Sequence, residues 1–546
     1  MTGNGYASLV FLGASVVTRG LPDPGADAVA VRDGEIIAVG RGDQIAELIG
    51  TRTEVVRLSG QSLLPGFQDA HNHPVSAGLD LLHCDLRGRD SVDGYLTAVH
   101  EYAAAHPDRD WVFGGGWSMD VFPGGLPHRE MLDKVVSERP VYLLNRDGHG
   151  ALANSRALEL AGLDERSTDP PDGRIERDAG GRPTGLLHEG ATDLVSRLLP
   201  AITEDQLLDG LLLGQRHLHA LGITAWQDAI VGNYLGSPNP LPAYVRAAQR
   251  GQLTARVVGA LWWQRERGAE QVDELVAIRD ASGHGRFSPT TVKVMLDGIV
   301  ETRTASMLAP YCGHDSEPAP GSFIEPEALK HYVCLLDAAG FQVHFHAVGD
   351  RAVREALDAI EAARDANGSN DNRHQIAHLD VVHPDDVRRF AALGAIANIQ
   401  PLWATHEPQT DDYKLPLLGP QRSAWSFPFG ALEAAGATIA AGSDWAVSSA
   451  DPLQGIHVAV NRQRADLDVK PFFAEQRISL HSAITAYTAG SAFANHLEKS
   501  TGTIEPGKAA DLVVLDGDVF ADPATAIAGH RVAATYVAGS PVYQTG

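Results

Sequence analysis

Between residues 64 and 442 the sequence alternates short apolar segments with amphipathic ones, and this alternation limits the fold more than any other feature. Helical patterns such as 352–364 and 384–392 separate the apolar segments. Strands that alternate with helices usually pair in parallel through helical crossovers. The sequence therefore predicts an α/β protein built on a (β/α)8 TIM-like barrel. The eight predicted strands are 64–70, 223–228, 255–261, 291–296, 342–346, 375–379, 395–399 and 438–442.

The two ends of the chain predict short β-strands instead of barrel units. Residues 1–60 and 501–546 each contain too few strands to bury a core alone, so we expect them to pair into one small accessory β-sandwich domain. The barrel would then occupy residues 61–500. The interval from about 75 to 200 is too long for a simple crossover. We expect it to be a large insertion after the first barrel strand that caps the active site.

Charge and cysteine content narrow the partners of the chain. It has 44 Lys and Arg residues against 69 Asp and Glu residues, a formal net charge of −25. A field of this sign repels nucleic acid and anionic membranes, so we expect a small-molecule substrate. The three cysteines are widely scattered and form no disulfide framework, which favours the cytoplasm. No uninterrupted apolar run of about 18 residues predicts a membrane span.

Polar residues lie in or directly after several predicted strands, at the edge where barrel enzymes carry their active sites. Residues two apart on a strand project to the same side, so a His-x-His pair can bind one cation. Neutral imidazole and carboxylate are ligands of zinc and related ions. Any one of these residues alone is more typical of a satisfied core position, but six together predict a metal site. They are His71 and His73, Lys293, His346, His378 and Asp444.

On these residues the chain resembles the amidohydrolase superfamily of metal-dependent hydrolases. Within it, the chain is similar to the YtcJ-like group, which includes N-substituted formamide deformylases. The resemblance covers nearly the whole length, and 502–514 is similar to the family's return into its accessory β domain. The segments that carry the resemblance are 65–73, 154–158, 183–189, 293–298, 346–352, His378, 400–401 and 442–444.

The resemblance implies one or two divalent metal ions, with zinc favoured. His71, His73 and Asp444 would bind the first ion, and His346 and His378 the second. The implied reaction is hydrolysis of the carbon–nitrogen bond of an amide or N-substituted formamide by metal-activated hydroxide. Asp444 would also be the general acid/base that passes a proton to the leaving nitrogen. The resemblance further leaves a homodimer open.

Two further residues have alternative roles in this site. Lys293 matches, by strand position, the lysine that binuclear members carboxylate. A carbamate would replace a buried cation with an anion that offers one oxygen to each metal. If Lys293 stays uncarboxylated, the site holds one metal. Glu189 is either a ligand that reaches in from the insertion or a surface or substrate-contact residue.

Candidates for substrate contact follow from their places in the chain. His149 is expected to act in catalysis by hydrogen-bonding a substrate carbonyl, with Asp147 as its orienting partner. The alternative is a turn in which Asp147 only satisfies the backbone. Trp117 is a candidate pocket wall or a packing residue. Arg303 either binds an anionic group or pairs with a nearby carboxylate, and Gln400, after the seventh strand, is a further candidate.

Two rival functions stay open. The same metal site could act on an ester, lactone, cyclic imide or carbon–carbon bond, because a fold and a metal centre define chemistry better than substrate. The alternative from another class is a non-catalytic metal-binding barrel. Buried ionisable groups at five or six positions argue against it, since a binding protein has no need to maintain them.

Overall fold

The computed structural model describes residues 5–234 and 238–545. At its centre is a wholly parallel eight-stranded sheet in the order β20-β19-β18-β17-β16-β15-β14-β7. The strands are β7 (Phe67–Asn72), β14 (Ile223–Val231), β15 (Arg256–Trp262), β16 (Phe287–Met295), β17 (Gln342–Ala347), β18 (Gln375–His378), β19 (Ile396–Ile399) and β20 (Thr438–Ala441). Each predicted strand overlaps one of these, so the TIM-like barrel is confirmed. The first prediction began too early, because Leu64 and Pro65 belong to another sheet, in β6 (Ser62–Pro65).

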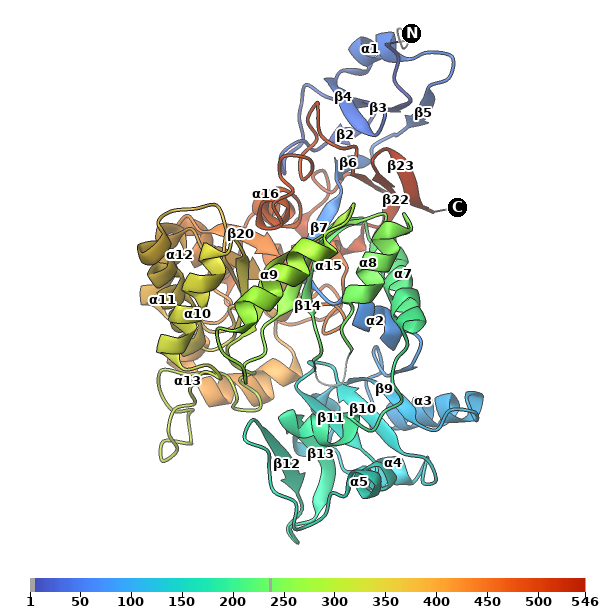
Figure 1. Cartoon of the computed structure of the whole chain (residues 1–546). Coiled ribbons are helices and arrows are strands. Elements are labelled where there is room, and N and C mark those ends of the chain that lie inside the picture. The colour runs from blue at the N-terminus through green and yellow to red at the C-terminus, as the bar shows by residue number, and fades with distance from the viewer. Residues whose placement is uncertain (1–4, 235–237, 546) are drawn as a thin grey trace.

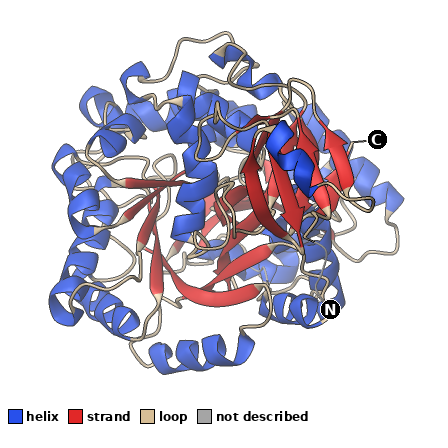
Figure 2. Ribbon diagram, turned by 90° about the horizontal axis from the view of Figure 1, so that it is seen from above, coloured by secondary structure: helices blue, strands red, loops and turns tan. Residues whose placement is uncertain are grey.

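Helices surround the barrel strands (Figure 2). The main ones are α7 (Glu204–Ala220), α8 (Leu241–Gln249), α9 (Gln271–Ser282), α10 (Pro326–Ala338), α11 (Asp350–Asn367), α12 (Pro384–Leu393), α14 (Phe429–Ala434) and α15 (Pro452–Asn461). α11 and α12 confirm the helices expected from the sequence. In α11 the apolar residues recur at helical spacing and face the core, namely Ala352, Val353, Ala356, Leu357 and Ile360. Within the described part of the chain, every helix is too short or too polar to cross a bilayer.

The first and last barrel strands approach each other through the segments that follow them. The backbone N–H of Asp444 donates to the carbonyl of His71 at 2.7 Å, and the N–H of His73 donates to that of Trp445 at 2.9 Å. Gly442 permits this approach, because a Cβ atom there would lie 2.5 Å from the Cβ of His71. The closure therefore brings together the two chain segments that carry His71, His73 and Asp444.

Between β7 and β14 the chain forms a second, six-stranded sheet, in the order β12-β13-β11-β10-β9-β8 (Figure 1). Its strands are β8 (Cys84–Asp85), β9 (Val112–Trp117), β10 (Val141–Asn145), β11 (Gly150–Ala153), β12 (Gly173–Arg177) and β13 (Pro183–Glu189). The same region contains α3 (Val92–Ala105), α4 (Arg129–Asp133) and α5 (Ser155–Ala161). The turn between β10 and β11 lines the same cavity as His71 and His73. This region therefore contributes to the barrel mouth.

The two ends of the chain lie on the same side of the barrel (Figure 1). One sheet, β4-β3-β1-β5, contains β1 (Leu9–Leu12), β3 (Ala28–Arg32), β4 (Glu35–Gly40) and β5 (Glu54–Arg57). The other, β2-β6-β21-β22-β23, joins β2 (Ser15–Val16) and β6 to β21 (Leu512–Leu515), β22 (Val532–Val537) and β23 (Ser540–Gln544). Both sheets contribute to one hydrophobic cluster, which includes Phe11, Val29, Leu63, Val514 and Tyr536. The domain limits near residues 60 and 500 stay predictions.

Candidate metal centre

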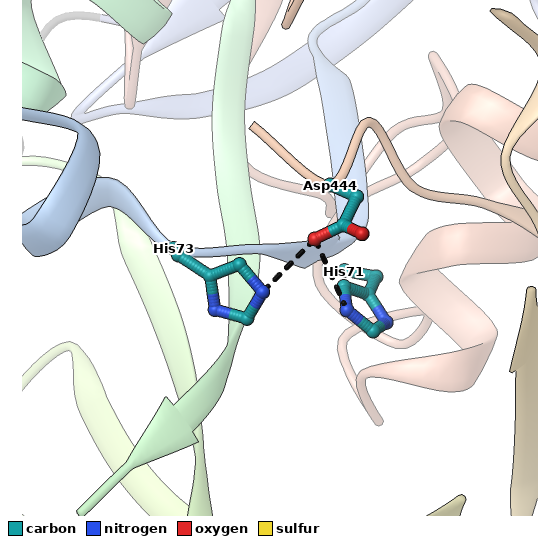
Figure 3. A group of neighbouring side chains, drawn as sticks. All are labelled: His71, His73 and Asp444. Carbon is teal, nitrogen blue, oxygen red and sulfur yellow. Dashed lines mark ion pairs between the residues drawn. The ribbon is translucent and has the colours of Figure 1, made fainter. Parts of the chain in front are cut away.

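Three side chains meet at the carboxyl edge of the barrel (Figure 3). Oδ1 of Asp444 lies 2.9 Å from Nε2 of His73 and 3.5 Å from Nε2 of His71. One potential ligand atom of each residue lies within 4.8 Å of the others. His71 and Asp444 are buried, whereas the side chain of His73 is 18% exposed. This group of three atoms can therefore hold one cation that is reached from the side of His73.

The other predicted ligands adjoin this group. The rings of His71 and His378 lie 4.8 Å apart between centroids, and those of His378 and His346 lie 4.3 Å apart. Nζ of Lys293 is 3.4 Å from Nε2 of His71. Lys293, His346 and His378 extend from β16, β17 and β18, three consecutive strands of the barrel. All six residues are thus neighbours at one edge, while the assignment of each as a ligand stays a prediction.

The charge states of these residues suit a divalent metal. Burial lowers the pKa of His71, His346 and His378 well below the usual value, and the charges of Lys293 and neighbouring imidazoles reinforce the effect. Neutral imidazole is the form that binds a metal. Burial also lowers the pKa of Lys293 to about 7. Among the described residues, Oδ1 of Asp444 has no hydrogen-bond partner despite its short distance to His73, as expected for an oxygen that faces a cation.

Asp69, which the sequence analysis did not select, connects the two halves of the centre. Its buried carboxylate accepts hydrogen bonds from the backbone N–H groups of His71 and Ser443, both at 3.0 Å. Burial raises the pKa of Asp69 to about 6. Because Ser443 directly precedes Asp444, this one carboxylate fixes the backbone beside predicted ligands from both the first and the last strand.

His344 supports the ring of His71. Nε2 of His344 lies 2.8 Å from Nδ1 of His71, and the other ring nitrogen of His344 contacts Oε1 of Gln227. When an imidazole binds a metal through one ring nitrogen, a residue that hydrogen-bonds its other ring nitrogen fixes the tautomer and the orientation of the ring. A sequence signal for His344 existed, because it stands two residues before His346 and residues two apart share a face of a strand.

Three residues of the site have backbone φ angles in the positive region that non-glycine residues rarely adopt. The angles are 48° at Glu189, 80° at His378 and 53° at Asp444. Each such residue typically costs about 1–3 kcal/mol, and such strain concentrates at functional sites. Oε1 of Gln400 accepts a hydrogen bond from the N–H of His378 at 2.8 Å. Gln400 is fully buried and supports His378, so the structure contradicts the prediction that it contacts the substrate.

His149 and Glu189 form a buried pair beside the metal centre. Nδ1 of His149 lies 3.1 and 3.2 Å from the two carboxylate oxygens of Glu189, and the Thr304 hydroxyl donates to Glu189 at 3.0 Å. Burial opposes the charged form of His149, but the Glu189 carboxylate raises its pKa to about 9. Oδ1 of Asp147 accepts from the N–H of His149 at 2.9 Å. Glu189 therefore pairs with His149, and whether it is also a ligand or contacts the substrate stays a prediction.

Two other predicted contacts lie away from the centre. Trp117 is 2% exposed and packs edge-on against Phe122 in the core of the six-stranded sheet. Arg303 pairs with Glu317 at 2.9 Å and lines a separate hollow. Neither residue lines the cavities that reach the metal centre, so the structure contradicts the prediction that they contact the substrate.

Two adjoining cavities, of about 160 and 480 Å³, reach the centre. Both are lined by apolar as well as charged and polar side chains, including Trp262 and Met295 in the smaller one and Leu402 and Trp403 in the larger one. The site therefore has space for a substrate beside the metal centre. The residues that line both cavities include Asp147, His149, His346, His378 and Asp444.

The sequence of the chain matches known proteins over nearly its whole length. The pattern of the amidohydrolase family matches residues 54–543. The protein LONG AFTER FAR-RED 3 of Arabidopsis thaliana is 31% identical, over 98% of this chain and 92% of its own length. The putative amidohydrolase YtcJ of Bacillus subtilis (strain 168) is 30% identical, over 95% of this chain and 96% of its own length.

Two further matches concern enzyme chemistry. The N-substituted formamide deformylase of Arthrobacter pascens is 25% identical over 98% of both chains. The solved structure of an uncharacterized metal-dependent hydrolase from Pyrococcus horikoshii OT3 is 25% identical and superposes with a TM-score of 0.74. That match covers 96% of this chain and 99% of the other.

Proposed function

The chain belongs to the amidohydrolase family and is a hydrolytic enzyme, and on this premise we propose that it cleaves the carbon–nitrogen bond of an amide or N-substituted formamide at a divalent metal centre. The observation that carries the proposal is the convergence of His71, His73 and Asp444 at the barrel edge, beside cavities that His149 also lines. The likeness to an N-substituted formamide deformylase supports the choice of substrate class.

We propose that His71, His73 and Asp444 hold the first ion and that His346 and His378 hold a second. Imidazole nitrogen and carboxylate oxygen, with neutral histidines, form a donor set that zinc favours. When bound, such an ion supplies a Lewis acid and an activated water. The likeness to a metal-dependent hydrolase supports the requirement for a metal.

We propose that Lys293 would be carboxylated to a carbamate when the site holds two ions. About half of its amine is unprotonated at neutral pH, since burial lowers its pKa to about 7, and an unprotonated amine adds to carbon dioxide with release of a proton. The carbamate would replace a buried positive charge with a negative one and would supply oxygen ligands for the ions. Without carboxylation, the site would hold a single ion.

The side chains of the chain perform the proton transfers. Asp444 takes a proton from the attacking water and gives it to the leaving nitrogen. His149, kept protonated by Glu189, donates from Nε2 to the substrate carbonyl oxygen and stabilises the negative charge that develops there. Glu189 does not touch the substrate in this mechanism, so it is a positioning residue for His149.

A substrate panel tests the proposed reaction. The metal-replete enzyme is incubated with N-substituted formamides, longer amides, esters, lactones and cyclic imides, and release of amine, alcohol or acid is measured. We expect turnover of a formamide or amide with release of its amine. Turnover of esters or lactones alone would contradict the proposed bond specificity, and stoichiometric metal without any turnover would favour a non-catalytic barrel.

Replacing Glu189 with Gln should change the pH profile. His149 is active when protonated, and Glu189 keeps it so toward pH 9. Without this carboxylate, burial lowers the pKa of His149, so the alkaline limb of kcat/KM should move to lower pH by at least one unit. At a pH on that limb, activity should fall by about tenfold or more. Steady-state rates from pH 5.5 to 10 measure the shift.

Glu176→Gln is the matched control, since Glu176 pairs with His188 on the same sheet. We expect its pH profile to match that of the native enzyme. A folded Glu189→Gln enzyme with an unshifted alkaline limb would contradict the role given to His149.

A further inference from the structure

The larger cavity beside the metal centre has more buried carboxylates than the proposed hydrolysis uses. It extends from His149 and Asp444 toward a wall of charged side chains, most of which have no role in the proposed reaction. The charged residues that line this cavity, apart from its histidines, are Arg87, Arg146, Asp147, Glu301, Asp380, Glu407, Lys414, Asp444 and Arg464.

At one side of this wall a single ammonium group faces two carboxylates. Nζ of Lys414 lies 2.5 Å from Oδ2 of Asp380 and 3.5 Å from Oε1 of Glu301. All three side chains are at most 6% exposed. Oδ1 of Asp380 has no hydrogen-bond partner among the described residues. This cluster therefore has one unbalanced negative charge.

Asp147 adds a second buried carboxylate oxygen without a partner. Its Oδ1 accepts the N–H of His149, while its buried Oδ2 lacks a hydrogen-bond partner in the described part of the chain. The nearest lining cation along the chain, Arg146, is directed to Glu407 and Gln409, at 3.7 and 2.8 Å. Arg146 and Glu407 thus balance each other in charge.

The two remaining arginines of the wall differ in how far nearby carboxylates engage them. Nε of Arg87 lies 2.7 Å from Oδ1 of Asp85. Nη2 of Arg464 lies 2.5 Å from Oδ2 of Asp466. Nη1 and Nη2 of Arg87 have no hydrogen-bond partner among the described residues, so Arg87 offsets part of the negative charge of the wall. Apart from that of Asp444, the carboxylate oxygens of the wall without a partner in the described chain are those of Asp147 and Asp380.

We propose that the larger cavity binds a cationic group of the substrate, an ammonium, amidinium or guanidinium, at the end remote from the scissile bond. Buried carboxylates without a partner are costly, and a bound cation with N–H donors would satisfy them. A carboxylate at the same position would be repelled by the wall. This inference rests on the proposed function, since it assigns a substrate class to that reaction.

A binding experiment tests the cation site without turnover. The metal-replete full-length enzyme is titrated calorimetrically with 1,5-diaminopentane and with pentane-1,5-diol, which share the alkyl chain and differ in the charge of their ends. We expect the diamine to bind at least about tenfold more tightly. Glu301→Gln should remove this preference, because it deletes one carboxylate while the Lys414–Asp380 pair remains.

Glu327→Gln serves as the charge-matched control, since Glu327 lies exposed on α10 and pairs with Lys330. We expect it to retain the preference for the diamine. If Glu301→Gln fails to fold by circular dichroism, Asp380→Asn replaces it in the same titration. Equal binding of the diamine and the diol to the native enzyme would overturn the proposal.

A turnover series separates this inference from the proposed reaction. Its members are mono-N-formyl-1,5-diaminopentane, N-pentylformamide and N-formyl-6-aminohexanoate, and we expect kcat/KM to decrease in that order. Turnover independent of charge would overturn the cation site and leave the reaction intact. Preferential diamine binding without turnover of any member would support the cation site and contradict the reaction.

The carboxylates could instead balance the charge of the metal ions, and metal analysis decides this. Native enzyme and Glu301→Gln are compared for bound metal by plasma mass spectrometry. We expect equal metal content together with the loss of diamine preference. Loss of metal from the variant with an unchanged preference for the diamine would overturn the proposal.

Discussion

Replacing Asp444 with Asn should reduce kcat/KM by about 10²–10⁴-fold, the range typical of a positioned acid/base group. The amide has nearly the shape of the carboxylate and keeps one oxygen ligand, but it cannot accept a proton from water and pass it on. Asn also tolerates the positive φ of 53° at this position. The variant should therefore fold and retain metal, which steady-state kinetics and metal analysis of the same sample will check.

Asp385→Asn is a suitable control, because Asp385 is exposed in the first turn of α12. It should leave both rate and metal content unchanged. Native rates in Asp444→Asn would remove Asp444 from the proton transfer. If the variant instead lost metal and regained full activity in excess zinc, Asp444 would be a ligand without an acid/base role.

The barrel was predictable because its signal is local. Each strand is a short apolar segment, and residues such as His346 and His378 stand out at its carboxyl end against apolar neighbours. Parallel strands place these ends at one edge, so strand order alone indicates which polar residues meet. The six predicted ligands could be selected without knowledge of the loops or the insertion. They lie together because all stand in or directly after strands of one parallel sheet.

Residues whose role depends on tertiary contacts were harder to predict from the sequence. Asp69 appears in the sequence as one acidic residue in an apolar strand, and only the closure beside β20 shows that it contacts Ser443. Trp117 ends β9 after three glycines, which suggested a loop at the pocket, but the six-stranded sheet buries it. Arg303 pairs with the carboxylate of Glu317, 14 residues later in the chain, and no pattern in the sequence indicates this partner.

Removing the metal should abolish activity and lower the thermal midpoint of unfolding. A ligand that binds only the folded state at 1,000 times its Kd adds about 4 kcal/mol to the free energy of unfolding. In the metal-free protein, Asp444 and the buried histidines lose the cation that offsets their desolvation. Dialysis against a chelator, followed by calorimetry and rate measurement, should show both losses, and added zinc should reverse both.

The variant His73→Ala links these losses to the predicted ligands. It removes an imidazole 2.9 Å from the Asp444 carboxylate, so zinc should restore neither the rate nor the thermal midpoint fully. His331→Ala, at an exposed position of α10, should respond to chelation and zinc as the native enzyme does. Full activity in protein shown to be free of metal would contradict the metal centre. Full rescue of His73→Ala by stoichiometric zinc would exclude His73 from the ligand set, because the remaining residues would then suffice to hold the ion.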